Sequence, residues 1–352
     1  MAVSKKTPER VWLTEVSDVA LQQSMRDADT AYRNFFSSLK GTRKGRKVKA
    51  PRFKSKHDHR QAIRITGKNN FAIRKVNHHK ALLRLPKMGE LRLNLSRPLP
   101  ATPTSVSVIR EADGRYYASF VVDTAVIDRP APVHQHAGID LGLNHLAVIA
   151  YDDGTHEKVE NPRGLRKQQR KLARAQKELA RRQKGSANRN KSRTKVAALH
   201  RKIRETRADH HHKLARKIVD ENQVIGVEDL AVAGLARTRL AKSVHDAGWG
   251  MLLRLIEEKA VEAGRTLVRA DRFFPSTRLC SACGVIGEAK ALSVRSWVCG
   301  CGVAHDRDVN AAVNLLHVAA GHAETVNACG GDVSLQRAAA NPGEAGTASV
   351  TV

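Results

Sequence analysis

Hydrophobic residues near the start of the chain recur at the spacing of an amphipathic helix. Between positions 9 and 40 they fall mostly three or four residues apart, in one broad stripe made of Leu13, Val16, Ala20, Leu21, Met25, Ala28, Tyr32, Phe35, Phe36 and Leu39. This pattern predicts one or two amphipathic helices. Glycine and proline then interrupt the segment GTRKGRKVKAPRFKSK, which predicts an irregular loop.

The pattern changes to short apolar runs between residues 62 and 123. Runs such as AIRIT, FAIRKV, ALLRL and YYASFVVD are rich in Val, Ile, Leu and Tyr and are separated by turn residues. Such runs predict strands, and we expect a small antiparallel β-barrel or sandwich. The segment RPAPVHQH, with Pro130 and Pro132, is the expected linker to the next domain.

Strand-like and helix-like segments alternate in the second half of the chain, which predicts an α/β fold. The segment AGIDLGLNHLAVIAYDDG predicts two strands joined by a tight turn, and QVIGVEDL predicts a further buried strand. We expect VHDAGWGMLLRLIEEKAVEAG to form one helix and TLVRA to form the strand after it.

The segment between these strands has a helical period. Leu165, Leu172 and Leu179 recur every seven residues, the polar stretch KGSANRNKS interrupts the pattern, and apolar spacing of three or four resumes from Val196 to Leu214. We therefore expect an antiparallel helical hairpin with charged outer faces.

Charge is the strongest compositional feature. The 352 residues include 62 Lys and Arg against 34 Asp and Glu, a formal net charge of +28. Residues 40–60 hold ten Lys or Arg against one acid, and residues 163–217 hold 21 against three. Segments of one sign repel themselves unless a polyanion neutralises them, and nucleic-acid phosphates do so with release of counterions. We therefore expect binding to DNA or RNA, with an anionic membrane surface as the weaker alternative.

The expected nucleic-acid contacts come from both basic segments: Arg43, Lys44, Arg46, Lys47, Arg52, Lys54, Arg166, Arg170, Arg174 and Arg181. An apolar fraction of 41% excludes a wholly disordered polycation, because it is enough to form folded cores. No stretch approaches the roughly 18 consecutive apolar residues of a membrane span. The start MAVSKKTPERVW lacks the apolar core of a secretory signal, and the cysteines are few, so we expect a cytoplasmic, reduced protein.

Three acidic residues stand where a predicted strand ends or a predicted helix begins: Asp140 in GIDLG, Glu228 in IGVEDL and Asp308 in HDRDVNAAVNLL. Each alone has a structural explanation, as a turn, an exposed strand end or, for Asp306 or Asp308, a helix cap. The apolar neighbours of Asp140 and Glu228 predict burial, where unpaired carboxylates are costly. Two carboxylates about 4 Å apart repel by roughly 4 kcal/mol at an effective dielectric of 20, a conflict that a divalent cation removes. We therefore predict a Mg²⁺ site, with two ions about 3.5 to 4 Å apart that could clamp a phosphodiester displacement.

Four cysteines form two close pairs, Cys280 with Cys283 and Cys299 with Cys301, separated by fifteen residues. Two pairs of thiolates predict a structural zinc ribbon rather than buried free cysteines. The glycine-rich loop cannot bury a core of its own, whereas structural zinc supplies roughly 10 to 16 kcal/mol in small finger peptides. Because the second pair is C-x-C rather than C-x-x-C, His305 is an alternative ligand to Cys301.

Together these motifs resemble the TnpB (OrfB) proteins that insertion sequences encode, a family long regarded as transposases and similar to compact ancestors of type V CRISPR effectors. The resemblance rests on GIDLGLNHLAVIAYDDG, GVEDL, FFPSTRLCSACG, WVCGCGVAHDRDVNAAVNLL and PRFKSK, and covers most of the chain from about Val11 onward. It implies an α/β fold: a RuvC-like nuclease core of RNase-H type with a helical-hairpin insertion and a zinc ribbon, preceded by a helical segment and a small β-barrel domain.

The resemblance also implies roles for individual residues. By position, Asp140, Glu228 and Asp308 match the first, second and third catalytic carboxylates, and they are the expected magnesium ligands. The expected zinc ligands are Cys280, Cys283, Cys299 and Cys301. Asp306 and Arg307 belong to the same DRD motif and have no assigned role.

The expected domains follow from the pattern and the resemblance. They are a helical recognition segment with a basic loop at 1–61, a β-barrel domain at 62–129, a nuclease at 130–320 with its insertion at about 163–220 and its ribbon at about 275–304, and a disordered tail at 321–352. The tail includes Cys329, to which we assign no role. Because family members usually begin with a first barrel strand and helix, we expect these two elements to be missing here before Met1.

The activity that the resemblance implies is Mg²⁺-dependent, RNA-guided DNA cleavage by a protein of a prokaryotic transposable element. The expected partners are a guide RNA from the transposon end and double-stranded target DNA with a short adjacent motif. Base pairing would read the target sequence, while the protein reads duplex shape and backbone. A transposase encoded nearby is a candidate partner, no membrane partner is expected, and the expected location is the nucleoid.

Two alternatives stand beside this hypothesis. One is an RNA-guided DNA-binding protein that does not cleave, and the other is a guide-independent transposase or resolvase.

Overall fold

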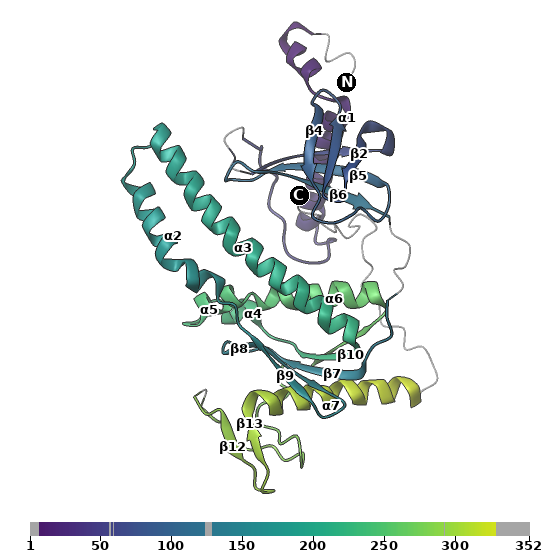
Figure 1. Ribbon diagram of the computed structural model, residues 1–352, viewed down its shortest axis with the longest axis vertical. Helices are drawn as coiled ribbons and strands as arrows, with labels where there is room; N and C mark the ends of the chain where they lie inside the picture. Colours follow the sequence, from purple (N-terminus) through teal and green to yellow (C-terminus); the bar gives the residue numbers. More distant parts are fainter. Residues whose placement is uncertain (1–6, 56–57, 59, 124–128, 292, 329–352) are drawn as a thin grey trace. The chain divides into compact units, whose positions relative to one another are not determined.

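The computed structural model of the chain describes residues 7–55, 58, 60–123, 129–291 and 293–328 (Figure 1). The chain divides into two compact units, the first formed mainly by residues up to Ala125 and the second mainly by residues from Val126 onward. Across these described ranges, no helix is long and apolar enough to cross a membrane.

The first unit begins with the predicted helices. They form as a 3₁₀-helix over Pro8–Glu15 and as α1 over Asp18–Leu39. Where residues 40–60 are described, they contain no helix or strand, as their glycines and proline predict.

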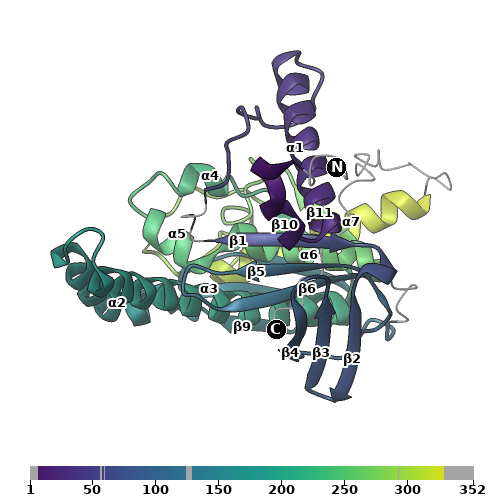
Figure 2. The ribbon, with the colours of Figure 1, turned by 90° about the horizontal axis from the view of Figure 1, so that it is seen from above.

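Six strands complete the first unit: β1 Gln61–Thr66, β2 Ala72–Asn77, β3 Lys80–Leu85, β4 Gly89–Asn94, β5 Pro103–Arg110 and β6 Tyr116–Val122. They form two antiparallel sheets, β1-β5-β6 and β2-β3-β4, whose strands run crosswise to each other (Figure 2). Ile65, Leu83 and Phe120 lie in one core shared by both sheets.

The expected β-barrel is therefore wrong in one respect, because no closed barrel forms within the described residues. Closure requires hydrogen bonds from strand to strand around the whole circuit. Here the short strands instead bury their apolar faces by packing one sheet against the other, which is the sandwich alternative.

The second unit is built on a mixed sheet with the order β11-β10-β7-β8-β9. Its strands are β7 His134–Asp140, β8 His145–Tyr151, β9 His156–Glu160, β10 Asn222–Glu228 and β11 Thr266–Ala270. Strand β10 runs parallel to both β7 and β11, whereas β8 and β9 are each antiparallel to their neighbours. Apolar runs predicted every strand except β9, whose sequence HEKVE lacks such a run.

Helices cover both faces of this sheet: α2 Gly164–Arg181, α3 Ala187–Glu221, α4 Val232–Leu235, α5 Ala241–Ala247, α6 Trp249–Ala263 and α7 Arg307–Ala328. Helix α6 and the C-terminal part of α3 lie on one face, and α7 lies on the other (Figure 1). The predicted hairpin forms from α2 and α3. Helix α3 begins inside the polar stretch that was expected to interrupt it, because the Ser186 side chain accepts a hydrogen bond from the Arg189 N–H and caps the helix.

One predicted helix is divided. The segment expected as a single helix forms α5 and α6, which meet at Gly248 with a positive φ of 68°. A Cβ at this position would lie 2.8 Å from the Arg207 side chain and 3.1 Å from the His211 ring. Any residue other than glycine would thus be strained by the positive φ and would displace these two side chains.

At the C-terminal end, α7 continues to Ala328, within the segment expected as a disordered tail. Residues 329–352, including Cys329, lie outside the described residues.

Candidate functional site

Strands β7 and β10 place two of the predicted carboxylates at the same end of the sheet. Gly138 lies opposite Gly226 in the parallel register, and each strand ends two residues later, at Asp140 and Glu228. Side chains two residues apart in a strand point to the same face. Both carboxylates therefore lie on the face to which the two glycines turn, the face covered by α7.

Helix α7 lies directly on the backbone of these two strands. A Cβ on Gly138 would stand 2.1 Å from the Ala312 carbonyl oxygen, and a Cβ on Gly226 would stand 2.2 Å from the Leu315 carbonyl oxygen. Asp308 lies one helical turn before Ala312, which is about 6 Å along the axis of α7. Asp140 lies two strand residues beyond Gly138, which is a similar distance along β7. The close approach thus brings Asp308 toward the ends of β7 and β10.

The charges of the three residues interact. Asp140 is only 8% exposed, and its burial, together with the nearby charges of Asp308 and Glu228, raises its pKa from 3.8 to about 7. Burial and the charge of Asp229 raise the pKa of Glu228. The structure therefore brings the three predicted residues into one electrostatic cluster, while their catalytic and metal-binding roles stay predictions.

Asp306 caps α7, as one of the two structural explanations for the DRD acids predicts. Its Oδ1 accepts the backbone N–H groups of Asp308 at 3.0 Å and Val309 at 3.1 Å, and its Oδ2 accepts from Lys158 Nζ at 2.7 Å. These bonds fix the first turn of the helix, and with it the backbone of Asp308.

Sequence reasoning missed two basic residues beside the cluster, Arg295 and Lys158. The Arg295 Nη1 atom lies 3.2 Å from Asp308 Oδ1, and the Arg307 N–H donates to the Arg295 carbonyl oxygen at 2.7 Å. No sequence pattern identifies the contact of Arg295 with Asp308 or that of Lys158 with Asp306, because the tertiary fold brings each pair together.

The carboxylates have the chemistry of a divalent cation site, because hard oxygen ligands that repel one another when buried suit Mg²⁺. Among the described residues, four cysteines have potential metal-ligand atoms that all lie within 4.8 Å of one another. The three carboxylates do not form such a group. Asp308 is instead paired with Arg295. Cation binding by Asp308 would thus have to replace its ion pair with Arg295.

The raised pKa of Asp140 makes the stability of the cation-free protein depend on pH. Between about pH 4 and 7 the folded protein holds a proton that the unfolded chain has released, so the free energy of unfolding falls as pH rises. The shift corresponds to at most about 4 kcal/mol. We expect Asp140→Asn to be more stable than the wild type near pH 8 and to lose this advantage near pH 4. Urea unfolding with a chelator measures the difference, and an equal difference at both pH values would contradict the raised pKa.

The four predicted cysteines form a compact cluster. Their Sγ atoms all lie within 4.8 Å of one another, with Cys280 3.8 Å from Cys301 and Cys283 3.7 Å from Cys299. Zinc–sulfur bonds of about 2.3 Å place the corners of a tetrahedron about 3.8 Å apart, so the cluster fits zinc. His305, the alternative to Cys301, lies beside the cluster, where its Nε2 is 3.1 Å from Cys280 Sγ.

Helix α7 also holds the start of the cysteine segment. The buried amides of Asn310 and Asn314 donate to the carbonyl oxygens of Ser276 and Leu279 at 2.8 to 3.4 Å, and Asn310 Oδ1 accepts the Ser281 N–H at 3.0 Å. Two short antiparallel strands, β12 Ser296–Val298 and β13 Ala304–Asp306, then lead back to α7. The cysteine cluster and the third carboxylate are therefore anchored on one helix.

We expect Cys280→Ser to reduce bound zinc from one ion per chain to none and to lower the melting temperature, because structural zinc contributes folding free energy directly. Metal analysis of the purified protein and a thermal melt measure the two effects. Ser281→Ala is the matched control, because only the backbone N–H of Ser281 bonds to Asn310. Full zinc content in Cys280→Ser would contradict the assignment.

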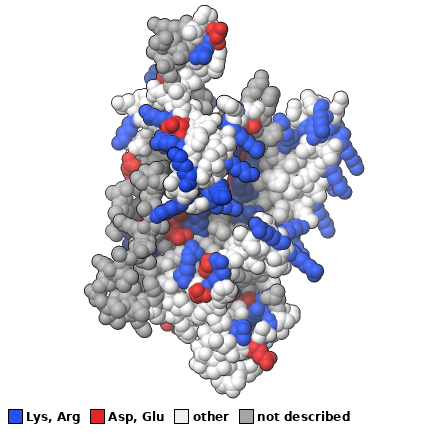
Figure 3. All heavy atoms as spheres, turned by 180° about the vertical axis from the view of Figure 1, so that it is seen from behind, with Lys and Arg blue, Asp and Glu red and all other residues white. Residues whose placement is uncertain are grey.

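The predicted nucleic-acid contacts are all exposed: Arg43, Lys44, Arg46, Lys47, Arg52 and Lys54 in the first unit, and Arg166, Arg170, Arg174 and Arg181 on α2 in the second. Lys and Arg side chains gather along α2 and α3 (Figure 3). Arg170, Arg174 and Arg181 line an open hollow of about 810 Å³ along α2. Exposed cations with few acids among them suit contact with a phosphate backbone.

Comparison with known families gives two matches. Residues 119–239 match OrfB_IS605, described as "Probable transposase", and residues 249–315 match the "Cas12f1-like, TNB domain". The first range includes Asp140 and Glu228, and the second includes the four cysteines and Asp308.

Several relatives align with most of the chain. A protein of Streptomyces pristinaespiralis named "Putative RNA-guided DNA endonuclease" is 40% identical over 343 residues, which cover 96% of this chain and 80% of the relative. The Escherichia coli K12 protein "Putative RNA-guided DNA endonuclease InsQ" is 31% identical and covers 93% of this chain and 79% of its own length.

Among solved structures, the chain is similar to Cas12f1 in a cryo-EM complex with sgRNA and target DNA. The TM-score is 0.55 at 15% identity, and the match covers 81% of this chain and 68% of that one. At this identity the likeness shows a shared mixed α/β fold.

Proposed function

Because the chain belongs to the same family as the two relatives named putative RNA-guided DNA endonucleases, and its residues 119–239 match the OrfB_IS605 transposase family, we propose that it is such an endonuclease, encoded by a transposable element. The guide is an RNA from the transposon end, and the target is double-stranded DNA. The observation that carries the proposal is the convergence of Asp140, Glu228 and Asp308 at one end of the sheet.

The strand order supports a RuvC-like core of RNase-H type. An antiparallel β7-β8-β9 meander continues through β7 into the parallel strands β10 and β11. The α2–α3 hairpin stands between β9 and β10, and the cysteine segment stands between β11 and α7. This is the arrangement that the family resemblance leads us to expect for a nuclease interrupted by a helical insertion and a ribbon.

In this proposal Asp140, Glu228 and Asp308 hold the catalytic Mg²⁺ ions. Bound Mg²⁺ would supply an activated water and stabilise the leaving oxygen of the phosphodiester. The protein sets the geometry, because α7 rests on Gly138 and Gly226. Burial of Asp140 excludes bulk water from the cluster and so strengthens its electrostatic interactions.

The test is a cleavage assay on a plasmid library with Mg²⁺, using protein purified with RNA from its native flanking locus. The expected result is cleavage that follows the guide sequence next to a fixed short motif. Changing the guide should move the cut to the new target, and removing the RNA should abolish cutting.

Each rival function gives a different result in this assay. Guided binding without cuts would favour the non-cleaving RNA-guided protein. Cutting that needs no RNA and follows DNA structure or transposon ends would favour a guide-independent transposase or resolvase. Either result would overturn the proposed activity.

A further inference from the structure

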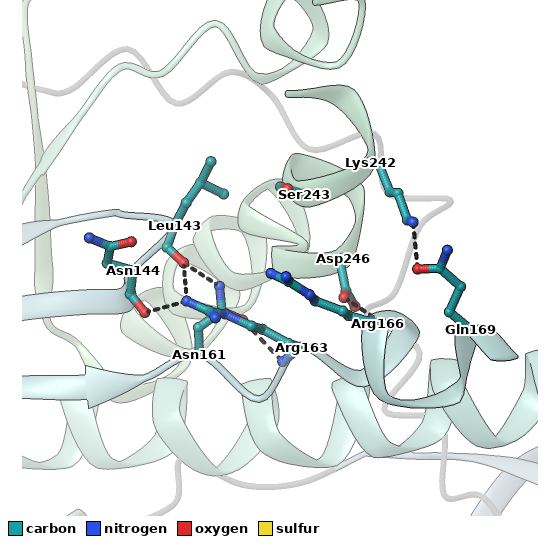
Figure 4. A pocket seen from close by; sticks show the side chains of 9 residues that line it. All are labelled: Leu143, Asn144, Asn161, Arg163, Arg166, Gln169, Lys242, Ser243 and Asp246. Carbon is teal, nitrogen blue, oxygen red and sulfur yellow. Dashed lines mark hydrogen bonds between the residues drawn. The ribbon is translucent and has the colours of Figure 1, made fainter. Parts of the chain in front are cut away.

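A polar cavity of about 410 Å³ lies beside the turn that follows Asp140 (Figure 4). Three segments build it: the β7–β8 turn with Asn144, the start of α2 with Asn161, Arg163 and Arg166, and α5 with Lys242. Of these residues only Arg166 is among the predicted nucleic-acid contacts, so the cavity adds to the sequence-based site.

The cavity has an excess of positive charge that the protein does not neutralise. Its carboxylate, Asp246, is buried, and its two oxygens accept the N–H groups of Leu165 at 2.8 Å and Arg166 at 3.0 Å. Asp246 also lies 4.0 Å from Arg207, outside the cavity lining. Its negative charge is therefore directed to the start of α2 and to Arg207. Among the described residues, no carboxylate forms an ion pair with Arg163, Arg166 or Lys242.

The two arginines differ in what they contact. Arg163 has a left-handed backbone with φ 46°, and its Nη2 lies 3.4 Å from the Leu143 carbonyl oxygen and 3.5 Å from that of Asn144. The Asn161 amide donates to the same Leu143 oxygen at 3.0 Å. These contacts hold the turn after the catalytic strand. The Arg166 side chain extends into the cavity and has no acceptor among the residues that the structure describes (Figure 4).

We propose that this cavity binds a phosphate of the target DNA strand close to the bond that is cut, an inference that rests on the proposed function. A free guanidinium fork beside an ammonium and neutral amide groups is suited to the oxygens of a phosphodiester. Lys242 completes this set from α5, where Gln169 orients its Nζ at 2.6 Å.

Position favours the strand that is cut over the guide RNA. Leu143 follows Asp140 by three positions, so their Cα atoms lie at most about 11 Å apart. The cavity thus lies at the end of the sheet where β7 and β10 place the carboxylates, and α5 builds it from the face opposite α7. A target strand that places one phosphate in the cavity can therefore carry a neighbouring bond to the carboxylates. The cavity would then set which bond of the strand reaches them.

The test measures binding of target DNA to the guide-RNA complex of the Asp140→Ala protein, in which cleavage cannot confuse the result. Single phosphates of the target strand near the expected cut are replaced, one at a time, by uncharged methylphosphonates. We expect one position at which this replacement weakens binding by about tenfold or more, as loss of a charge-assisted hydrogen bond would. In Asp140→Ala with Arg166→Ala, the same replacement should have no further effect.

Two variants complete the design. In Lys242→Ala, as in Arg166→Ala, the same methylphosphonate should have no further effect on binding, because Lys242 lines the cavity from α5. Lys167→Ala is the matched control, because it removes one positive charge from the next position of α2, whose side chain does not line the cavity. In the Lys167→Ala control, the methylphosphonate should weaken binding as strongly as it does in the Asp140→Ala protein without a second substitution.

Each outcome decides the proposal. Coupling to a guide-RNA phosphate instead of a target phosphate would overturn the assignment to the target strand. Guided binding without any position coupled to Arg166, or with equal coupling to Lys167, would overturn the cavity site and leave the proposed function standing. Absence of guided binding in the wild-type protein would overturn the proposed function, and the cavity assignment with it.

Discussion

Replacement of Asp140 by alanine is expected to reduce guided DNA cleavage at least about a thousandfold while guide RNA stays bound. Asp140 is the most buried carboxylate of the cluster and interacts electrostatically with both Asp308 and Glu228. A bound metal ion contributes several kcal/mol to stabilisation of the transition state in phosphoryl transfer. Loss of that contribution corresponds to a rate effect of this size. Single-turnover cleavage of a guided target, with RNA content measured on the same preparation, tests the prediction.

The other two carboxylates supply the comparison. Glu228→Gln and Asp308→Asn keep the size of the side chain and remove its charge, and both should lose cleavage to a similar extent. Asp152→Asn is the control, because its carboxylate accepts N–H groups at the opposite end of β7 from Asp140. Wild-type cleavage rates in Asp140→Ala would remove this residue from the catalytic cluster.

The second large effect is expected from a single methyl group under α7. In Gly138→Ala the new Cβ would stand 2.1 Å from both the Ala312 carbonyl oxygen and the Leu316 nitrogen. Both are backbone atoms of a helix, which cannot turn aside as a flexible side chain can. We expect α7 to shift, the free energy of unfolding to fall by about 3 kcal/mol or more, and cleavage to fall with it because Asp308 moves.

A matched substitution on the same helix separates this steric effect from the general effect of adding a methyl group. A Cβ on Gly321, also in α7, would meet nothing within 4 Å. Gly321→Ala should therefore be neutral or stabilising by up to about 1 kcal/mol, because alanine favours helix. Denaturant unfolding of both variants gives the comparison. If Gly138→Ala proves as stable as Gly321→Ala, the close approach of α7 to the sheet is wrong.

The sequence predicted those parts of the fold in which the apolar pattern is strong. Strand β8 is a nearly continuous apolar run, and β7 and β10 contain the shorter runs AGI and VIGV; all three strands form around these runs. Strand β7 also includes His134, Gln135 and His136, which were expected to belong to the linker. Strand β9 was missed because HEKVE alternates polar with weakly apolar residues. The division at Gly248 was missed because its cause is contact with Arg207 and His211, and a residue pattern within one helix does not contain that contact.

At the candidate site too, sequence patterns identified some residues, whereas other contacts arise only from the tertiary fold. Asp140, Glu228 and Asp308 could be selected because each ends a strand or starts a helix, and strand ends gather at one edge of a parallel pair. One usable pattern was overlooked: in both β7 and β10 a glycine precedes the carboxylate by two residues. The Arg295–Asp308 pair had no such pattern, since it joins a loop to a helix through the fold alone.

The place of α7 late in the chain has a consequence for synthesis on the ribosome. A nascent chain that ends before Arg307 already contains Asp140 and Glu228, but it lacks the third carboxylate. It also lacks the helix that covers Val148 and Ala150 on the sheet. The proposed catalytic site can therefore form only after α7 has left the exit tunnel, so we expect an incomplete polypeptide not to cleave DNA.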